Sequence, residues 1–282
     1  MSLLFSLRER LCDLLGDLWF RLDRRHREIV RRNLAFAYGA EMDKDTRERL
    51  AREVFRQFVR FGLEILELLV LPLPVIRRKV LIVGEEHFRA ALAQGRGLLV
   101  IGAHAGNWEY TVTGFGLKYE GVAVVARELT QPWLRPLARR LRERGGNVMI
   151  NKQRGLKEIQ SYLRQNRIVG IIIDQNTADD EGLLVNFFGQ PARTTPVAAL
   201  LARRRGVPVL PAFSRRLPDG RHLLAILPPL PLKKTPNPEA DILTHLQEQS
   251  RAVEAWVRAA PAQWLWLHRR WKNQFPELYE GL

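Results

Sequence analysis

The chain of 282 residues contains one cysteine and no recognisable metal, cofactor or serine-hydrolase motif. The single Cys12 cannot form an intrachain disulfide, which points to a reducing compartment. Cysteines and histidines are not spaced as in a zinc site, so we expect no metal. A Gly-x-Ser-x-Gly turn is missing, which argues against a hydrolase of the Ser-His-Asp type. A phosphate-cradling glycine loop is also missing, and we expect no cofactor.

Long apolar runs are missing as well. A membrane-spanning helix needs about 18 or more consecutive apolar residues. The closest stretch, Leu63 to Ile76, is interrupted by two glutamates and two prolines. The apolar residues at the N-terminus are spaced rather than continuous, and no small-residue cleavage site follows them. The sequence therefore predicts a protein that stays in the cytosol or lies on a membrane without crossing it.

Lysine is scarce, yet the chain is strongly basic. Only eight of its 45 basic residues are lysine, and the formal net charge is +15. Such a charge suits nucleic acid, an anionic membrane or an acidic protein partner, although a general preference for arginine explains part of it. The basic residues are spread along the chain without a recognised binding motif, so we expect no nucleic acid. A basic membrane- or nucleic-acid-binding protein is the non-enzyme alternative.

The first 22 residues have the pattern of an amphipathic helix. Leucines recur at spacings of three and four, at positions 4, 7, 11, 14, 15, 18 and 22. Aromatic and arginine side chains accompany them, as is typical of a helix that lies on anionic lipid. Packing on the protein's own domain explains the same pattern equally well. Two further helices are expected before Pro72 and Pro74, which we interpret as the end of an N-terminal helical region, 1–74.

From residue 75 to residue 282, apolar segments of strand length alternate with helical patterns. This alternation predicts an α/β domain, a mostly parallel mixed sheet covered by helices. Three expected strands end in polar or charged residues, His104, Arg127 and Asp174. Because the carboxyl ends of parallel strands lie at one edge, these side chains are expected to converge there, where open α/β sheets place their sites.

The stretch around His104 carries the clearest chemistry. Leu98 to Ile101 is an apolar strand pattern, and Asn107 is a good N-cap for a helix that follows the histidine. Glu109 lies in the first turn of that helix and is expected to fold back towards His104. A carboxylate on one imidazole nitrogen fixes the tautomer and supports the imidazolium that forms when the other nitrogen takes a proton. A structural histidine is the alternative interpretation.

Four blocks of the chain, in order, resemble the late acyltransferases of lipid A biosynthesis, within the wider lysophospholipid acyltransferase group. Asn33-Leu34 is similar to their N-terminal region, and Gly102 to Glu109 matches their His-x4-Glu motif. Asp174-Gln175, Phe187-Phe188-Gly189 and Ala192 to Thr195 resemble their second block. Pro261 to Lys272, with Trp264, Trp266 and Trp271, resembles their C-terminal signature. The chain departs from them in lacking a spanning first helix and in the Glu-Leu-Thr-Gln-Pro that follows Arg127.

The resemblance implies acyl transfer from a thioester on acyl carrier protein to a hydroxyl of a lipid A precursor. His104 is then the general base and Glu109 its partner. The expected substrate-binding residues are Arg127, Arg142, Asp174, Gln175, Phe187, Phe188, Gly189 and Thr194. An arginine suits phosphate or the oxyanion, Asp174 and Gln175 would shape the pocket, and the two phenylalanines would form its acyl or acceptor wall. The three tryptophans would form an interfacial belt or pack into the domain.

The same resemblance implies the partners and the location. Besides acyl carrier protein and the lipid acceptor, an anionic membrane surface is expected, with the enzyme peripheral or monotopic on the cytoplasmic face of the inner membrane. The alternative within this class is an acyltransferase acting on another acceptor, namely a lysophospholipid, an amino-acid lipid or a glycolipid.

Overall fold

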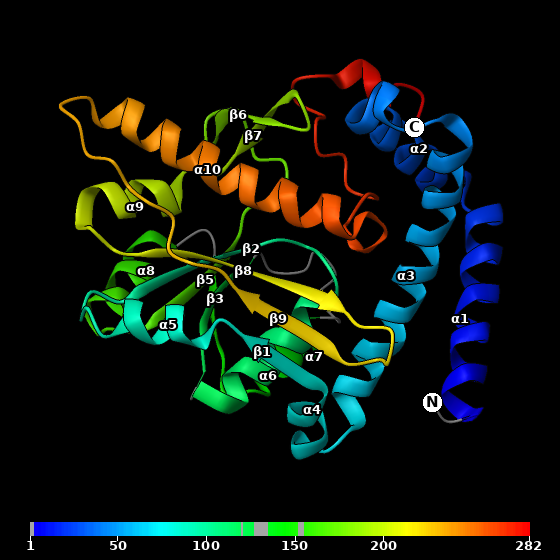
Figure 1. Cartoon of the computed structure of the whole chain (residues 1–282), viewed down its shortest axis with the longest axis horizontal. Helices are drawn as coiled ribbons and strands as arrows, with labels where there is room; N and C mark the ends of the chain where they lie inside the picture. Colours follow the sequence, from blue (N-terminus) through cyan, green and yellow to red (C-terminus); the bar gives the residue numbers. More distant parts are fainter. Residues whose placement is uncertain (1–2, 120, 127–134, 152–154) are drawn as a thin grey trace.

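A mixed sheet forms the centre of the computed structural model (Figure 1). Among the residues that the structure describes, 3–119, 121–126, 135–151 and 155–282, seven strands lie in the order β1-β9-β8-β2-β5-β3-β4. All neighbours are parallel except the antiparallel pair β8 and β9. The strands of this sheet are β1 Val80–Val83, β2 Leu98–Gly102, β3 Ala123–Ala126, β4 Val148–Asn151, β5 Ile168–Ile172, β8 Val209–Arg216 and β9 His222–Ile226. The predicted α/β class, with a mostly parallel mixed sheet, is confirmed.

Helices cover both faces of the sheet. One face packs against α5 and α6 through residues such as Leu98, Phe88 and Phe115. The opposite face packs against α8, α9 and α10 through residues such as Ile101 and Val253. The helices are α1 Leu3–Leu22, α2 Arg24–Tyr38, α3 Lys44–Val70, α4 Leu73–Lys79, α5 Glu85–Leu92, α6 Trp108–Tyr119, α7 Arg135–Glu143, α8 Gly155–Arg164, α9 Val197–Arg205 and α10 Pro238–Ala259.

Two segments differ from the local sequence-based expectations. A short helix begins at the two prolines, since Pro72 is the N-cap of α4 and Pro74 occupies its first turn. Proline is favoured there, since the first turn leaves backbone N–H groups unpaired anyway. The block around Phe187-Phe188-Gly189, for which the sequence predicted no element, belongs to a hairpin of β6 Leu183–Phe187 and β7 Gln190–Thr194. Phe188 and Gly189 both have positive φ, 55° and 75°, as a two-residue hairpin turn requires.

The N-terminal helices lie along one side of the sheet domain, where α1 and α3 run side by side (Figure 1). The acidic face of α1 pairs with arginines of α3: Asp17 with Arg56 at 2.8 Å, and Glu9 with Arg60 at 2.7 Å. On α2, the side chain of Asn33 donates to the carbonyl oxygens of Trp266 and His268 in the C-terminal segment. These contacts join the helical region to the rest of the chain, and the division at residue 75 stays a prediction.

The outer face of α1 is apolar and exposed. Its solvent-facing leucines are Leu7, Leu11, Leu14, Leu15, Leu18 and Leu22. Packing on the protein's own domain is confirmed for the charged face of α1, which contacts α3, while contact of the leucine face with lipid stays a prediction. Across the described residues, none of the helices has the length and apolar character needed to span a membrane.

Candidate active site

His104 and Asp174 meet because their strands are neighbours in register. In the parallel pairing of β2 with β5, Gly102 lies opposite Ile172. His104 lies two residues after Gly102, and Asp174 lies two residues after Ile172. Both therefore leave the sheet at the same carboxyl edge, as the sequence predicted for these strand ends.

Asp174 takes part in three hydrogen bonds, two with His104 and one with Trp264. Its Oδ1 lies 2.7 Å from Nδ1 of His104, and its Oδ2 accepts the backbone N–H of His104, also at 2.7 Å. The indole N–H of Trp264 donates to the same Oδ2 at 2.7 Å. Burial opposes ionisation of Asp174, but the charge of His104 and these hydrogen bonds hold its pKa below the ordinary value. Asp174 is therefore a carboxylate at neutral pH, and it occupies Nδ1 of the imidazole.

Glu109 has a different partner from the one predicted. Its Oε1 accepts a hydrogen bond from Nε of Arg142 at 2.9 Å. The predicted pairing of Glu109 with His104 is therefore wrong in this structure, where Asp174 takes that place. The physical reason is the direction of α6, whose N-cap Asn107 starts a helix that presents Glu109 to α7 rather than to the imidazole. Glu109 and Arg142 nevertheless line the same cavity as His104.

His104 lines a cavity of about 720 Å³, which extends between the sheet and the helices α5 and α6. Its volume lies within the usual range of ligand pockets, about 300–1,000 Å³. The polar lining at one end includes His104, Glu109, Arg142, Gln175 and His268. The rest is apolar, and small residues on the strands leave space where larger side chains would fill it. The apolar and small lining residues include Phe88, Leu98, Val100, Gly102, Phe115, Val124, Gly170, Ala212, Leu224 and Ile226.

The C-terminal segment builds the back of the site. Trp264 forms an isolated antiparallel bridge with Ala105, and the backbone N–H of Leu265 donates to the carbonyl oxygen of His104 at 3.1 Å. His268 lines the cavity, and its Nε2 accepts the backbone N–H of Asn176 at 2.9 Å. Burial and the charge of Arg270 lower the pKa of His268 to about 4, so its imidazole is neutral.

All three tryptophans of the C-terminal signature are buried. Of the two interpretations offered for them, packing holds and an interfacial belt does not. Trp264 has a further role that sequence reasoning missed, since its indole orients Asp174. The sequence signal for such a role was the high density of tryptophan and arginine between Pro261 and Lys272.

Several predicted substrate-binding residues lie elsewhere. Phe187 and Phe188 are buried in the core against Trp264 and Trp266 rather than lining the cavity among the described residues. Gly189 forms the exposed hairpin turn. The hydroxyl of Thr194 accepts a hydrogen bond from buried Arg270 at 2.5 Å. Phe187, Phe188 and Thr194 support the fold around the site, and none of the four residues is part of the cavity lining among the described residues.

The remaining predictions divide into two groups. Gln175 and Arg142 line the same cavity as His104, and Asp174 bonds the imidazole itself, while the binding of substrate by these residues stays a prediction. Arg127 lies outside the described residues. In the part of the chain that the structure describes, the site combines an imidazole, of which one nitrogen is held by a buried carboxylate, with the polar lining of a largely apolar cavity. Such a pair can remove a proton from a hydroxyl next to a bound acyl chain.

Comparison with known proteins agrees with this chemistry. Residues 2–273 match the family described as "Bacterial lipid A biosynthesis acyltransferase". The chain is 30% identical over 265 residues to the lipid A biosynthesis lauroyltransferase of Escherichia coli K12, covering 92% of this chain and 83% of that protein. It is 23% identical over 283 residues to a lipid A biosynthesis acyltransferase of Haemophilus influenzae, covering 98% and 86%. It is also 23% identical over 248 residues to a phosphatidylinositol mannoside acyltransferase of Mycolicibacterium smegmatis, covering 86% and 79%. The chain belongs to the bacterial lipid A biosynthesis acyltransferase family.

Proposed function

We propose that the protein transfers a fatty acyl group from an acyl carrier protein thioester to a hydroxyl of a lipid A precursor. In this reaction Nε2 of His104 takes the proton of the acceptor hydroxyl as its oxygen attacks the thioester carbonyl carbon. The tetrahedral intermediate then collapses, the carbon–sulfur bond breaks, and the imidazolium returns the proton to the departing thiolate. The ester oxygen comes from the acceptor, so no covalent acyl-enzyme is needed.

The observation that carries this proposal is the position of His104, held by Asp174, among the polar residues that line the largely apolar cavity. Asp174 is ionised and accepts from Nδ1, so it supports the imidazolium that forms during the attack. The apolar part of the cavity suits the acyl chain and sets its carbonyl group near the histidine. Both requirements of the reaction, a base and a place for the chain, are met within one site.

Arg142 and Glu109 supply the second polar element. The guanidinium of Arg142 lines the cavity and is held by Glu109 at 2.9 Å, which fixes its direction. A fixed guanidinium beside the reacting atoms suits either the oxyanion of the tetrahedral intermediate or a phosphate of the acceptor. We assign Glu109 to orienting Arg142, in place of the partnership with His104 that the motif suggested.

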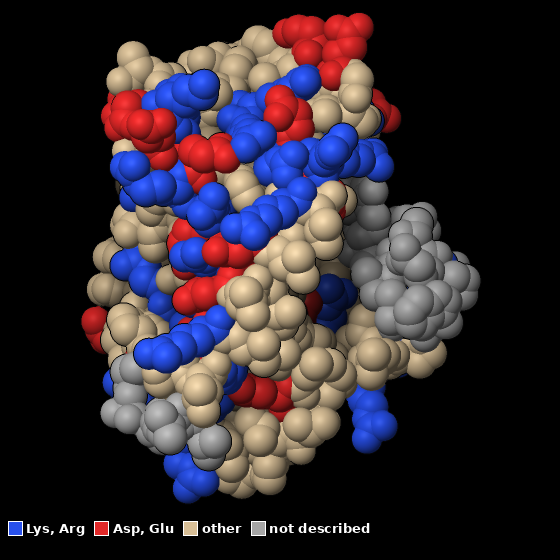
Figure 2. All heavy atoms as spheres, turned by 90° about the vertical axis from the view of Figure 1, so that its right-hand side faces the viewer, with Lys and Arg blue, Asp and Glu red and all other residues tan. Residues whose placement is uncertain are grey.

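The exposed leucine face of α1 is the proposed contact with the membrane. Figure 2 shows the side of the molecule on which α1 lies, with a band of uncharged surface bordered by many Lys and Arg side chains. Such a combination suits an interfacial helix on anionic lipid, and it would hold the enzyme peripherally or monotopically on the cytoplasmic face of the inner membrane. The salt bridges to α3 keep the leucines turned outward.

The donor is assigned on chemical grounds. The net charge of +15 favours encounter with an acidic carrier protein, and opposite charges raise association rates. The lipid A acyltransferase family supports a lipid A precursor as the acceptor. The similarity to a mannoside acyltransferase makes a glycolipid the second candidate, since such an acceptor would meet the same base and cavity.

An acyl-transfer assay read by mass spectrometry tests the proposal. Purified enzyme receives acyl carrier protein thioesters of several chain lengths and a panel of acceptors, namely a Kdo-primed lipid A precursor, lysophospholipids and glycolipids. We expect one acyl mass to be added to the lipid A precursor, with no product from a His104→Ala enzyme. Transfer only to another acceptor would replace the acceptor assignment, and no transfer to any of them would refute the proposed function.

A further inference from the structure

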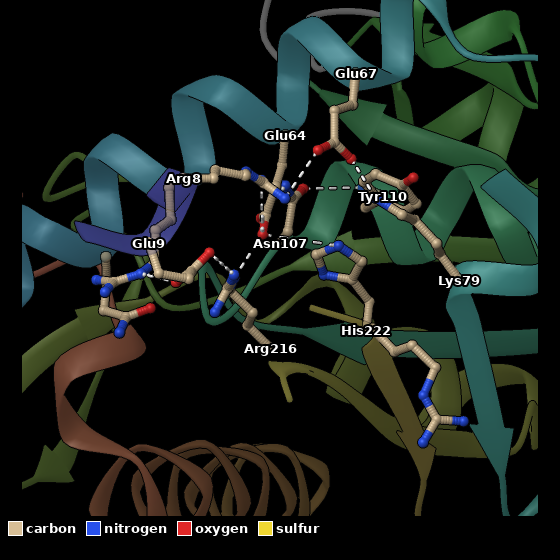
Figure 3. Close-up of polar contacts among 12 residues, drawn as sticks. Arg8, Glu9, Glu64, Glu67, Lys79, Asn107, Tyr110, Arg216 and His222 are labelled. Atoms are coloured by element: carbon tan, nitrogen blue, oxygen red, sulfur yellow. Dashed lines mark hydrogen bonds and ion pairs between the residues drawn. The ribbon is translucent and has the colours of Figure 1, made fainter. Parts of the chain in front are cut away.

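A cluster of charged side chains, buried at its centre and partly exposed at its edges, lies behind the catalytic loop (Figure 3). Its members come from elements far apart in the sequence, since α1, α3, α6, β8 and β9 all contribute. The side chains labelled in Figure 3 are Arg8, Glu9, Glu64, Glu67, Lys79, Asn107, Tyr110, Arg216 and His222. None of the charged residues among them lines the cavity that holds His104. The proposed reaction therefore leaves this cluster without a role.

Glu64 of α3 is the centre of the cluster. Its side chain is only 2% exposed, and its two carboxylate oxygens have different partners. Oε1 accepts from Nε of Arg216 at 2.6 Å, and Oε2 accepts from the side-chain amide of Asn107 at 3.0 Å. A buried carboxylate is costly unless it is paired and hydrogen-bonded, and these two contacts, together with Arg8 at 4.0 Å from Oε1, offset that cost.

Asn107 connects this carboxylate to the catalytic loop. Its amide nitrogen donates to Glu64, while its carbonyl Oδ1 accepts the backbone N–H of Tyr110 at 3.0 Å and so caps α6. The residue lies three positions after His104 and two before Glu109. One fully buried side chain thus sets the place where the loop of the base becomes the helix that carries Glu109.

The same loop is held from a second side by β8. The backbone N–H of Gly106 donates to the carbonyl oxygen of Gln263 at 2.9 Å, and the side chain of Gln263 bonds the backbone of Arg216 in both directions. Arg216 therefore holds Gln263 with its backbone and Glu64 with its guanidinium. Its Nη2 also donates to Glu9 of α1 at 2.7 Å, which links the N-terminal helix to the support of the loop.

We propose that Glu64 is a positioning residue, which sets the place of His104 and Glu109 through its hydrogen bond to Asn107. The inference rests on the proposed function, because it gives Glu64 a task in the same acyl transfer. Its carboxylate does not reach the reacting atoms and acts only through Asn107. A shift of about 1 Å in catalytic geometry costs on the order of 10²-fold in rate, so a change at Glu64 should appear in kcat rather than in KM.

Reversing the direction of one hydrogen bond tests this role. In Glu64→Gln the guanidinium of Arg216 takes the new amide oxygen, which turns the amide nitrogen toward the amide nitrogen of Asn107, so two donors oppose each other. In Asn107→Asp two carboxylates oppose each other, although the helix cap is kept. The double variant restores a donor facing an acceptor and keeps the net charge, since the carboxylate has moved from position 64 to position 107. We expect each single variant to lower kcat about 10- to 100-fold with KM unchanged, and the double variant to recover most of the loss.

The matched control is Glu48→Gln. Glu48 is also on α3 and also pairs with an arginine, Arg31, but it is 39% exposed and does not contact the catalytic loop. Rates are measured per folded molecule, well below the melting temperature of every variant. Unchanged kcat in folded Glu64→Gln and Asn107→Asp enzymes would overturn the proposal, because a purely structural role changes the melting temperature alone. An equal loss of kcat in Glu9→Gln, which keeps both hydrogen bonds of Glu64, would also overturn it, since the role would then belong to the contact with α1.

A second readout separates this inference from the proposed function. The chain has six histidines, and the imidazole signals of His104 in nitrogen-15 NMR spectra are assigned by their loss in His104→Ala. If the wild-type enzyme transfers no acyl group, the proposed function fails while the NMR test still applies. Signals of His104 that move in Glu64→Gln, return in the double variant and stay in place in Glu48→Gln support the positioning role. Signals that do not move in Glu64→Gln overturn it.

Discussion

Replacing Asp174 by asparagine tests the pair that the structure places at the centre of the site. The substitution keeps the size of the side chain but removes the negative charge that faces His104 at 2.7 Å. With the two charge centres about 4 Å apart and an effective dielectric constant of about 20, the attraction lost from the imidazolium is about 4 kcal/mol. Each 1.36 kcal/mol is a factor of ten in rate, so kcat should fall about 10³-fold.

The assay is the initial rate of acyl transfer at saturating donor and acceptor. Asp241→Asn is the matched control, because Asp241 is also buried and paired with an arginine, Arg203 at 2.6 Å, but lies on α10. Circular dichroism and the melting temperature show whether each variant is folded. We expect the loss in Asp174→Asn alone, and a folded Asp174→Asn enzyme with wild-type kcat would refute the reasoning.

Three further predictions concern stability and membrane binding. Gly106 has φ +58°, and a Cβ there would lie 2.8 Å from the carbonyl group of Ser214. Gly106→Ala should therefore lower the free energy of unfolding, measured in urea, by about 1–3 kcal/mol. Burial lowers the pKa of His222 to about 3. Below pH 6.5 the imidazole is therefore protonated in the unfolded chain but stays neutral in the folded protein, so the free energy of unfolding falls as the pH drops. His222→Phe should remove a slope that grows from about 0.7 kcal/mol per pH unit at pH 6.5 to about 1.4 near pH 5, and an unchanged slope would contradict the assignment. Leu14 and Leu18 are 67% and 49% exposed. Replacing both by serine should weaken binding to anionic vesicles at least about tenfold in a sedimentation assay. Unchanged binding would show that another part of the protein contacts the membrane.

The sequence predicted the sheet and its reactive edge because strand ends and helix caps are local signals. The apolar run before His104, the cap at Asn107 and the strand before Asp174 all appear in the structure at the expected places. The convergence of His104 and Asp174 needed only that their strands be parallel neighbours, which the alternation of strands and helices made the natural expectation.

The partner of the histidine was harder to predict. A five-residue spacing places Glu109 near His104 in the sequence, whereas Asp174 is 70 positions away and reaches the imidazole only through the register of β2 with β5. The same limit hid Trp264, whose contact with Asp174 depends on how the C-terminal segment folds back over the sheet edge. The roles expected for Phe187 and Phe188 came from resemblance, and their burial in the core depends on a hairpin that the sequence analysis did not predict.

The central claim is that His104 acts as the base of acyl transfer in this cavity. The most direct test is a single-turnover experiment, with enzyme in excess of a labelled acyl thioester and with the acceptor identified in the panel. We expect a His104→Ala enzyme, with a wild-type melting temperature and an intact thioester, to form product at least about 10³-fold more slowly. A His104→Ala enzyme that transfers the acyl group at the wild-type rate would contradict it.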